Sequence, residues 1–202
     1  MDTDSESAMD DMEDLAGREA ARGFCSENLA FSSYDPVRDD HVFNCLQNSS
    51  YSIINWCAST PRPMDPNFTT RVAKHLQRRS HLFVIIYAAG YPIGTLFFKS
   101  SHRDMVHHRC SKLGIGILKK YQDYETEAIN WALDWAFNRA NLHRVEMDVP
   151  SWNLRMGKLC DETGFHTEGE RKECYFKDGE WWNEVNMSML KKDWKERQET
   201  KE

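Results

Sequence analysis

Two apolar segments joined by a short turn restrict the folds open to this chain more than any other feature. Residues 82–89 read Leu-Phe-Val-Ile-Ile-Tyr-Ala-Ala, residues 90–92 read Gly-Tyr-Pro, and residues 93–98 return as a second apolar run. Both runs are far shorter than the roughly 20 residues needed to cross a bilayer. Their pattern is typical of neighbouring strands in an antiparallel hairpin. We therefore expect a core built on a sheet, and no integral membrane protein.

Further strand and helix patterns flank this hairpin. We predict strands over 28–34, 112–118, 144–149, 165–176 and 181–190, and helices over 37–47, 68–79, 126–139, 152–163 and 191–202. Residues 51–67 carry three prolines and are expected to be irregular. At 202 residues and 40% hydrophobic content, one domain is expected. The order of elements predicts an α+β fold, with a mixed, mostly antiparallel central sheet of six to seven strands and helices on both faces.

Negative charge is concentrated at the start of the chain. Residues 1–22 hold eight of the 32 acidic and two of the 26 basic side chains, which leaves 24 of each for the remainder. We expect a disordered acidic tail over 1–22, with a docking segment for a basic partner as the alternative. The domain is expected over 23–196, followed by a polar C-terminal tail over 197–202. Because acidic and basic side chains are equal in number after residue 22, the chain is not expected to be a dedicated nucleic-acid-binding protein.

The termini and cysteines suggest where the protein resides. The first residues lack the basic start and apolar stretch of a secretory signal, so a cytoplasmic or nuclear location is expected. Six cysteines without a CxxC pair are expected to be free thiols. His102, His107, His108 and Cys110 have no standard ligand spacing, so no metal site is expected.

Six segments in the second half carry a family resemblance. They are LGIGI (113–117), TEAINWALDWAF (126–137), LHRVEMDV (142–149), SWNLR (151–155), ETGFHTEGERKE (162–173) and DGEWWNEVNMSML (178–190). In this order and spacing, residues 112–194 resemble the GNAT acetyltransferase superfamily. The similarity is greatest to the branch of bacterial ribosomal-protein N-terminal acetyltransferases and spermidine acetyltransferases. The segment WALDWAF favours a fungal source, and the N-terminal half fits the family only by its element order.

The resemblance implies an acetyl-CoA-dependent N-acetyltransferase with a GNAT fold, in which a primary amine attacks the thioester directly. In relatives the pantetheine arm enters between two splayed central strands, here 113–118 and 144–149. The diphosphate lies on amides at the start of the following helix, as expected of any helix N-terminus. The implied cofactor-binding residues are Ile115, Gly116, Ile117, Leu118, Gln122, Asp123, Tyr124, Glu125, Thr126 and Asn153. For Asn153, a helix cap is the compatible alternative.

The acceptor and the oligomeric state are left open. A small-molecule amine, a polyamine and a protein N-terminus all suit this branch of the family. We expect no nucleic-acid or membrane partner, and a homodimer is one option.

The segment expected to hold the diphosphate differs in sequence from the same segment in relatives of the family. They usually read Tyr-Gln-Gly-Lys-Gly-Tyr-Gly-Thr-Glu-Ala, whereas residues 121–128 read Tyr-Gln-Asp-Tyr-Glu-Thr-Glu-Ala. Two residues and every glycine are missing, and Asp123 and Glu125 stand near the expected anion. Like charges about 4 Å apart repel by roughly 4 kcal/mol at an effective dielectric near 20. Asp123 can also cap the following helix and so occupy the amides that a phosphate needs. Alternatively, both carboxylates turn outward. In either case Lys119 and Lys120 can offset part of the repulsion.

The positions expected to handle protons also differ from those of relatives. Lys112 stands where relatives often have glutamate, Cys160 where many have a tyrosine acid, and Asn183 where an acidic residue is common. Cys160 is a candidate acid or a small buried core residue. Glu146 and Glu184 are candidate bases or ordinary surface charges. The alternative to an enzyme is a catalytically impaired GNAT-fold protein that acts as a binding or regulatory module.

Overall fold

The computed structural model describes residues 23–48, 66–100 and 103–200. The predicted acidic tail and most of the predicted irregular segment lie outside the described residues. The seven strands are β1 (Leu29–Ser32), β2 (Ser80–Ala88), β3 (Tyr91–Lys99), β4 (Cys110–Ile117), β5 (Arg144–Pro150), β6 (His166–Lys177) and β7 (Glu180–Leu190). The longer helices are α2 (Pro36–Asn48), α4 (Pro66–Arg79), α5 (Glu125–Asp134), α6 (Leu154–Thr163) and α7 (Lys191–Glu199).

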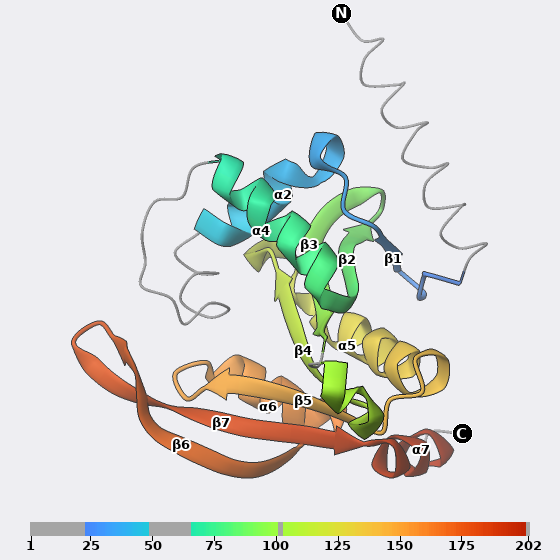
Figure 1. Cartoon of the computed structure of the whole chain (residues 1–202), viewed down its shortest axis with the longest axis vertical. Helices are drawn as coiled ribbons and strands as arrows, with labels where there is room; N and C mark the ends of the chain where they lie inside the picture. Colours follow the sequence, from blue (N-terminus) through green and yellow to red (C-terminus); the bar gives the residue numbers. More distant parts are fainter. Residues whose placement is uncertain (1–22, 49–65, 101–102, 201–202) are drawn as a thin grey trace, which may run out of the picture.

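All seven strands join one sheet in the order β1-β2-β3-β4-β5-β7-β6. Every neighbouring pair is antiparallel except β4 and β5, which are parallel. The predicted mixed, mostly antiparallel sheet is therefore confirmed, and each predicted strand is present with small shifts at its ends. The hairpin of β6 and β7 extends along one edge of the molecule (Figure 1). Its turn uses Asp178 and Gly179, both with positive φ, as an Asp-Gly hairpin requires.

Helices cover both faces of the sheet, as predicted. α2 and α4 lie together over one face of its N-terminal half, and α5 lies on the other (Figure 1). This arrangement explains the unbroken apolar run of β2. Phe83, Ile85 and Tyr87 pack with α2 and α4, while Val84 and Ile86 join the core around α5, because successive strand residues face opposite sides.

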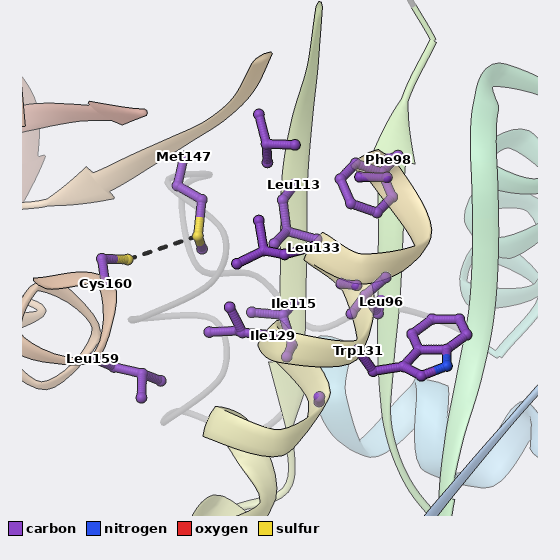
Figure 2. Close-up of a cluster of buried hydrophobic side chains, with 14 of the residues drawn as sticks. Leu96, Phe98, Leu113, Ile115, Ile129, Trp131, Leu133, Met147, Leu159 and Cys160 are labelled. Carbon is purple, nitrogen blue, oxygen red and sulfur yellow. Dashed lines mark hydrogen bonds between the residues drawn. The ribbon is translucent and has the colours of Figure 1, made fainter. Parts of the chain in front are cut away.

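The packing of α5 against the sheet fixes the centre of the domain. Trp131 stacks on Phe31 of β1 with ring centroids 3.6 Å apart. Leu113 and Ile115 of β4 lie beside Ile129 in the same buried cluster (Figure 2). The predicted helix 126–139 is divided in the structure: α5 ends at Asp134 and a π-helical turn, η3 (Trp135–Arg139), follows.

Two shorter elements lie around β4. A 3₁₀ turn, η1 (Arg103–His108), precedes it, and a second, η2 (Lys119–Tyr124), connects it to α5. α7 begins directly after β7 and ends at Glu199, so the helix passes the residue 196 boundary proposed for the domain. No helix in the described segments is both long and apolar enough to traverse a lipid bilayer.

The stacked Phe31 and Trp131 rings provide a test of this core. Phe31 is fully buried, so Phe31→Ala leaves a cavity and should lower the free energy of unfolding by about 3–5 kcal/mol. Phe176 is 63% exposed beside Trp181, so Phe176→Ala should cost less than about 1 kcal/mol. Urea denaturation of both variants measures the difference, and equal losses would contradict the described packing.

Candidate functional site

A cleft opens where β4 and β5 part. Their parallel pairing covers three residue pairs and ends at Lys112↔Glu146, whereas β3 stays paired with β4 as far as Ile117. The strands therefore diverge as the family resemblance implied. The cleft encloses about 280 Å³. It is lined by residues of β3, β4, β5, the start of α6, β6 and β7, namely Phe97, Lys99, Lys112, Leu113, Gly114, Ile115, Met147, Asp148, Val149, Pro150, Asn153, Met156, Tyr175 and Glu184.

One edge of β4 faces this cleft without a strand to pair with. The N–H of Leu118 donates to the carbonyl of Ile93 on the β3 side at 2.9 Å. Because backbone groups alternate between the two sides of a strand, those of Leu113, Ile115 and Ile117 point towards β5. The Lys112↔Glu146 pair engages the N–H of Leu113, and beyond it β5 does not pair with them in the described strands. This edge can hydrogen-bond an extended amide-bearing ligand in the way that a neighbouring strand would.

The predicted cofactor residues of β4 are only partly brought to the cavity. Ile115 lines it, while Gly116, Ile117 and Leu118 lie outside its lining and lead to η2. Gly114 lines it as well, and a Cβ there would lie 2.3 Å from the ring of Phe97. Glycine at this position therefore leaves room for the ring of Phe97.

The segment expected to hold the diphosphate is not an open glycine loop. It is the 3₁₀ turn η2, which contains Gln122, Asp123 and Tyr124 and leads directly into α5. The N–H of Glu125 already donates to the carbonyl of Gln122, and the N–H of Tyr121 donates to Leu118 at 2.8 Å. Two amides of this segment are thus engaged within it, which reduces the number that an anion can use.

The carboxylates of this segment take opposite orientations. Asp123 is exposed, and Tyr124 is the N-cap of α5 without a side-chain cap hydrogen bond, so Asp123 does not cap the helix. Glu125 instead turns inward and is only 6% exposed. The expectation that both turn outward is therefore correct for Asp123 and wrong for Glu125, while Thr126 is exposed in the first turn of α5.

Arg155 places a positive charge beside the buried Glu125 carboxylate. Arg155 of α6 lies 3.0 Å from Oε2 of Glu125 and also donates to the carbonyl of Gln122 at 2.8 Å. Burial raises the pKa of Glu125 above its ordinary value, although the positive charge of Arg155 acts in the opposite direction. Arg155 therefore connects the start of α6 to the turn where a coenzyme diphosphate is expected.

Asn153 both caps α6 and lies in the wall of the cleft. Its side chain accepts a hydrogen bond from the N–H of Met156 at 3.2 Å and caps α6. The same residue lines the cleft. The cap is thus confirmed, and contact with a coenzyme stays a prediction.

Glu184 is the one of the three proposed catalytic residues that lines the cleft. It is 7% exposed. The hydroxyl of Tyr175 donates to one of its carboxylate oxygens, and the guanidinium of Arg171 lies 3.3 Å from the other. Burial raises the pKa of Tyr175, and its hydrogen bond to Glu184 adds to the effect, so the phenol stays protonated.

Glu146 and Cys160 lie outside the lining of the cleft. Glu146 accepts hydrogen bonds from Arg144 at 2.9 Å and from Cys110 at 3.3 Å. Cys160 of α6 is fully buried, and its thiol points at the sulfur of Met147, 3.6 Å away (Figure 2). Burial raises the pKa of Cys160 to about 12, which weakens it as an acid near neutral pH. This environment favours its interpretation as a core residue.

Three polar residues of this region were not among the predicted site residues. Asp148 pairs with Lys112 across the opening of the cleft, Tyr175 holds Glu184, and Arg155 pairs with Glu125. The alternation of charged and apolar residues along β5 was a signal for Asp148, because it places Glu146 and Asp148 on one face. Among the described residues, no group of three His, Cys, Asp or Glu side chains is arranged to hold a metal.

Residues 34–166 match a family model described as the acetyltransferase (GNAT) domain. The chain belongs to the GNAT acetyltransferase family. The match begins at residue 34, so the similarity also includes the N-terminal half, which the sequence analysis assigned only by element order.

Curated GNAT relatives match shorter segments. Spermidine N(1)-acetyltransferase of Vibrio cholerae is 31% identical over 94 residues, 46% of this chain and 54% of that protein. The [ribosomal protein uS5]-alanine N-acetyltransferase of Escherichia coli is 30% identical over 104 residues, 50% of this chain and 53% of that protein. An uncharacterized N-acetyltransferase of Bacillus subtilis, YnaD, is 31% identical over 71 residues, 35% of this chain and 42% of that protein. The matches thus span about half of these relatives or less. All three are bacterial, so they do not support the expected fungal source.

Solved structures show the same fold. Spermidine N-acetyltransferase from Vibrio cholerae in complex with CoA and spermine superposes with a TM-score of 0.74 at 22% identity, over 84% of this chain and 99% of that chain. An acetyltransferase of the GNAT family from Bacillus anthracis gives a TM-score of 0.71 at 17% identity, over 84% of this chain and 98% of that chain. At these identities the likeness shows the fold alone.

The buried Glu125 carboxyl predicts a pH-dependent stability. Its pKa is raised in the folded protein above the ordinary 4.5, so the folded state binds more protons and loses stability as the pH rises from about 4.5. Glu125→Gln removes this loss. We expect the Tm of the variant relative to wild type to rise between about pH 4 and neutral pH.

Thermal unfolding across that range measures the effect. Asp134→Asn is the matched control, because it changes an exposed carboxyl of the same helix. A Tm difference for Glu125→Gln that is flat, or that falls with pH, would contradict the assigned environment of Glu125.

Proposed function

We propose that this protein transfers an acetyl group from acetyl-CoA to a primary amine. The observation that carries the proposal is the early parting of β4 and β5, which leaves an unpaired edge of β4 along a cleft in a GNAT-family chain. A solved structural neighbour is a spermidine N-acetyltransferase in complex with CoA and spermine, and the relatives are named N-acetyltransferases.

The residues present fit the pantetheine part of the coenzyme. The backbone of Leu113 and Ile115 would hold its amides, and Asn153 and Met156 would form the opposite wall. Acetyl-CoA supplies the thioester carbonyl that the amine attacks. The walls of the cleft would shield one side of that carbonyl from bulk water, which favours attack by the amine over hydrolysis.

The diphosphate part would be held mainly by side-chain cations. Lys119 and Lys120 are exposed on η2, and Arg155 lies beside it. The turn η2 has no glycine, and two amides of this segment already donate hydrogen bonds within it, so the backbone can contribute less to diphosphate binding. Asp123 and Glu125 oppose an anion there, so we expect coenzyme affinity to depend on how far these cations outweigh the two carboxylates.

Among the predicted catalytic residues, we retain Glu184 as a charged group of the cleft. Tyr175 and Arg171 fix its carboxylate in one position. We assign no chemical role to Glu146 or Cys160, because neither residue lines the cleft.

The acceptor would be a polyamine, another small amine or a protein N-terminus. Relatives named for spermidine and for an alanine of ribosomal protein uS5 support the first and last of these. A structural neighbour described as dodecameric supports self-association, and our proposal is a homodimer or larger oligomer in the cytoplasm or nucleus.

One observation favours a second candidate function. The buried carboxylate of Glu125 lies in the segment where an anion would bind. A protein whose coenzyme site is weakened in this way would act as a binding or regulatory module with little catalysis.

Thermal shift with acetyl-CoA distinguishes the two candidates. A ligand at 100 times its Kd stabilises the folded state by about 2.7 kcal/mol, which corresponds to a few degrees for a chain of this size. We expect such a shift at millimolar acetyl-CoA or below, accompanied by release of free thiol when an amine is added. No shift at millimolar coenzyme would exclude the enzyme and leave the binding module.

The two carboxylates should weaken coenzyme binding in a diphosphate-dependent way. Asp123→Asn and Glu125→Gln are each expected to tighten acetyl-CoA binding by up to about tenfold, since a like charge is removed. S-acetylpantetheine lacks the diphosphate and is the control ligand, whose Kd should stay the same. Equal changes for both ligands in calorimetric titrations would show that the carboxylates act on the cleft in general.

A further inference from the structure

The solvent side of helix α4 concentrates positive charge. Four cations are exposed on it, namely Arg71, Lys74, Arg78 and Arg79. Spacings of three, four and seven residues place the first three on one side of the helix, with the fourth beside them. Between residues 66 and 103 the sequence contains no aspartate or glutamate. We call these four cations the basic face of α4.

The opposite side of α4 fixes the direction of the basic face. Val72, Ala73 and Leu76 belong to the same apolar cluster as Phe83 and Ile85 of β2. Because an α-helix completes a turn every 3.6 residues, the side chains across from this apolar row point into solvent. The basic face is therefore a surface that the packing of α4 on the sheet holds in place.

The charges of this face are not balanced within the described part of the chain. There, none of the four cations forms an ion pair with a carboxylate. The helix dipole favours Arg78 and Arg79 in the last turn, but it does not account for Arg71 and Lys74 earlier in the helix. Like charges three and four residues apart on a helix repel each other. An anionic partner bound along the face would remove this repulsion.

The other long helices do not share this imbalance. α2, α6 and α7 carry acidic side chains among their basic ones, and α5 carries three acidic side chains and no basic one. Among the five longer helices of the described ranges, α4 alone has basic side chains without acidic ones. An acidic segment therefore meets the least competition from neighbouring carboxylates on α4.

The acidic segment at the start of the sequence is long enough to reach this face. Residues 1–22 carry eight acidic and two basic side chains. They join the described chain at Gly23, next to Arg139 and close to the edge strand β1. Fully extended, 22 residues span about 70 Å, whereas a domain of this size has a radius of gyration of about 16 Å. A tethered segment meets a site on its own chain at an effective concentration of about millimolar, so several weak ion pairs are enough to hold it.

We propose that residues 1–22 bind the basic face of α4 within the same chain and cover it. The carboxylates of the segment supply the counter-charge that the face lacks. The face ends beside the coenzyme cleft, because Arg79 leads into Ser80, whose strand partner Lys99 lines that cleft. Bound in this way, the segment keeps other polyanions off this surface.

Carbodiimide cross-linking of the full chain tests the contact, because the reagent joins a carboxylate to an amine only where the two are close together. Mass spectrometry should find residues 1–22 joined to Lys74, and the yield should fall as NaCl is raised from about 20 mM to about 500 mM. Lys192 and Lys195, exposed on α7, are the reference amines. A segment joined to Lys74 no more often than to these two would overturn the proposal.

A mixture of isotope-labelled and unlabelled chains identifies the occupant of the face. Binding within one chain gives cross-linked peptides in which both halves carry the same label. Pairs of mixed label at the level expected for random exchange would show that a second copy occupies the face, and would overturn the proposal.

Removal of charge from the face tests the same contact without changing the segment. Arg71→Gln/Arg78→Gln keeps Lys74 and should lower its cross-linking yield with residues 1–22 by about threefold or more, since two exposed ion pairs are lost. Lys192→Gln/Lys195→Gln removes the same charge from α7 and should leave that yield unchanged. Circular dichroism checks that both variants fold. An unchanged yield in the α4 variant, or equal falls in the two variants, would contradict binding at the basic face.

Covering of the face is measured with heparin as a polyanion probe. Asp10→Asn/Asp11→Asn/Glu13→Gln/Asp14→Asn removes four of the eight acidic side chains of the segment and should tighten heparin binding by about threefold or more at constant salt. Calorimetric titration measures the Kd.

The gain in heparin affinity should depend on α4. Adding Arg71→Gln/Arg78→Gln to the segment variant should abolish it, whereas adding Lys192→Gln/Lys195→Gln should leave most of it. No gain, or a gain that survives the α4 changes, would show that the segment does not cover this face. None of these measurements uses acetyl-CoA, so their outcome does not depend on the proposed function.

Discussion

The early end of the parallel pairing between β4 and β5 is the constraint on which the rest of this structure depends. After Lys112↔Glu146 the two strands separate, yet β4 stays straight because β3 pairs with it on the other side as far as Ile117. Its apolar face is held by α5 through residues such as Ile129. An unpaired strand edge is normally costly when buried. Here it lines a cavity, where a ligand or water can satisfy it.

The sequence predicts the sheet well because its strands and turns carry local signals. The apolar runs of β2 and β3 and the Asp178-Gly179 turn place two hairpins without reference to the rest of the chain. The orientation of the site residues depends on distant partners instead. Glu125 turns inward because Arg155, thirty residues later, meets it there, and no local pattern distinguishes it from the exposed Asp123. The same applies to Cys160, whose surroundings are set by α6 packing on β5.

The charges at the point where β4 and β5 separate differ from those that the family resemblance implies. The family resemblance marks Lys112 as a position where relatives often carry glutamate. In this chain the carboxylate is on the facing strand, at Asp148, and the cation is on β4. A sequence comparison that reads one position at a time records only the lost glutamate.

The β6–β7 hairpin is connected to the cleft through Asn183. A bulge lies in β6 between Arg171 and Tyr175, and the side chain of Asn183 accepts a hydrogen bond from the N–H of Glu173 within it at 2.8 Å. The backbone of Asn183 also bonds to Ser151, just before α6. Bulges commonly redirect side chains near functional sites. This one brings both Arg171 and Tyr175 onto Glu184, so Asn183, which stands where relatives often have an acid, links the position of that carboxylate to the start of α6.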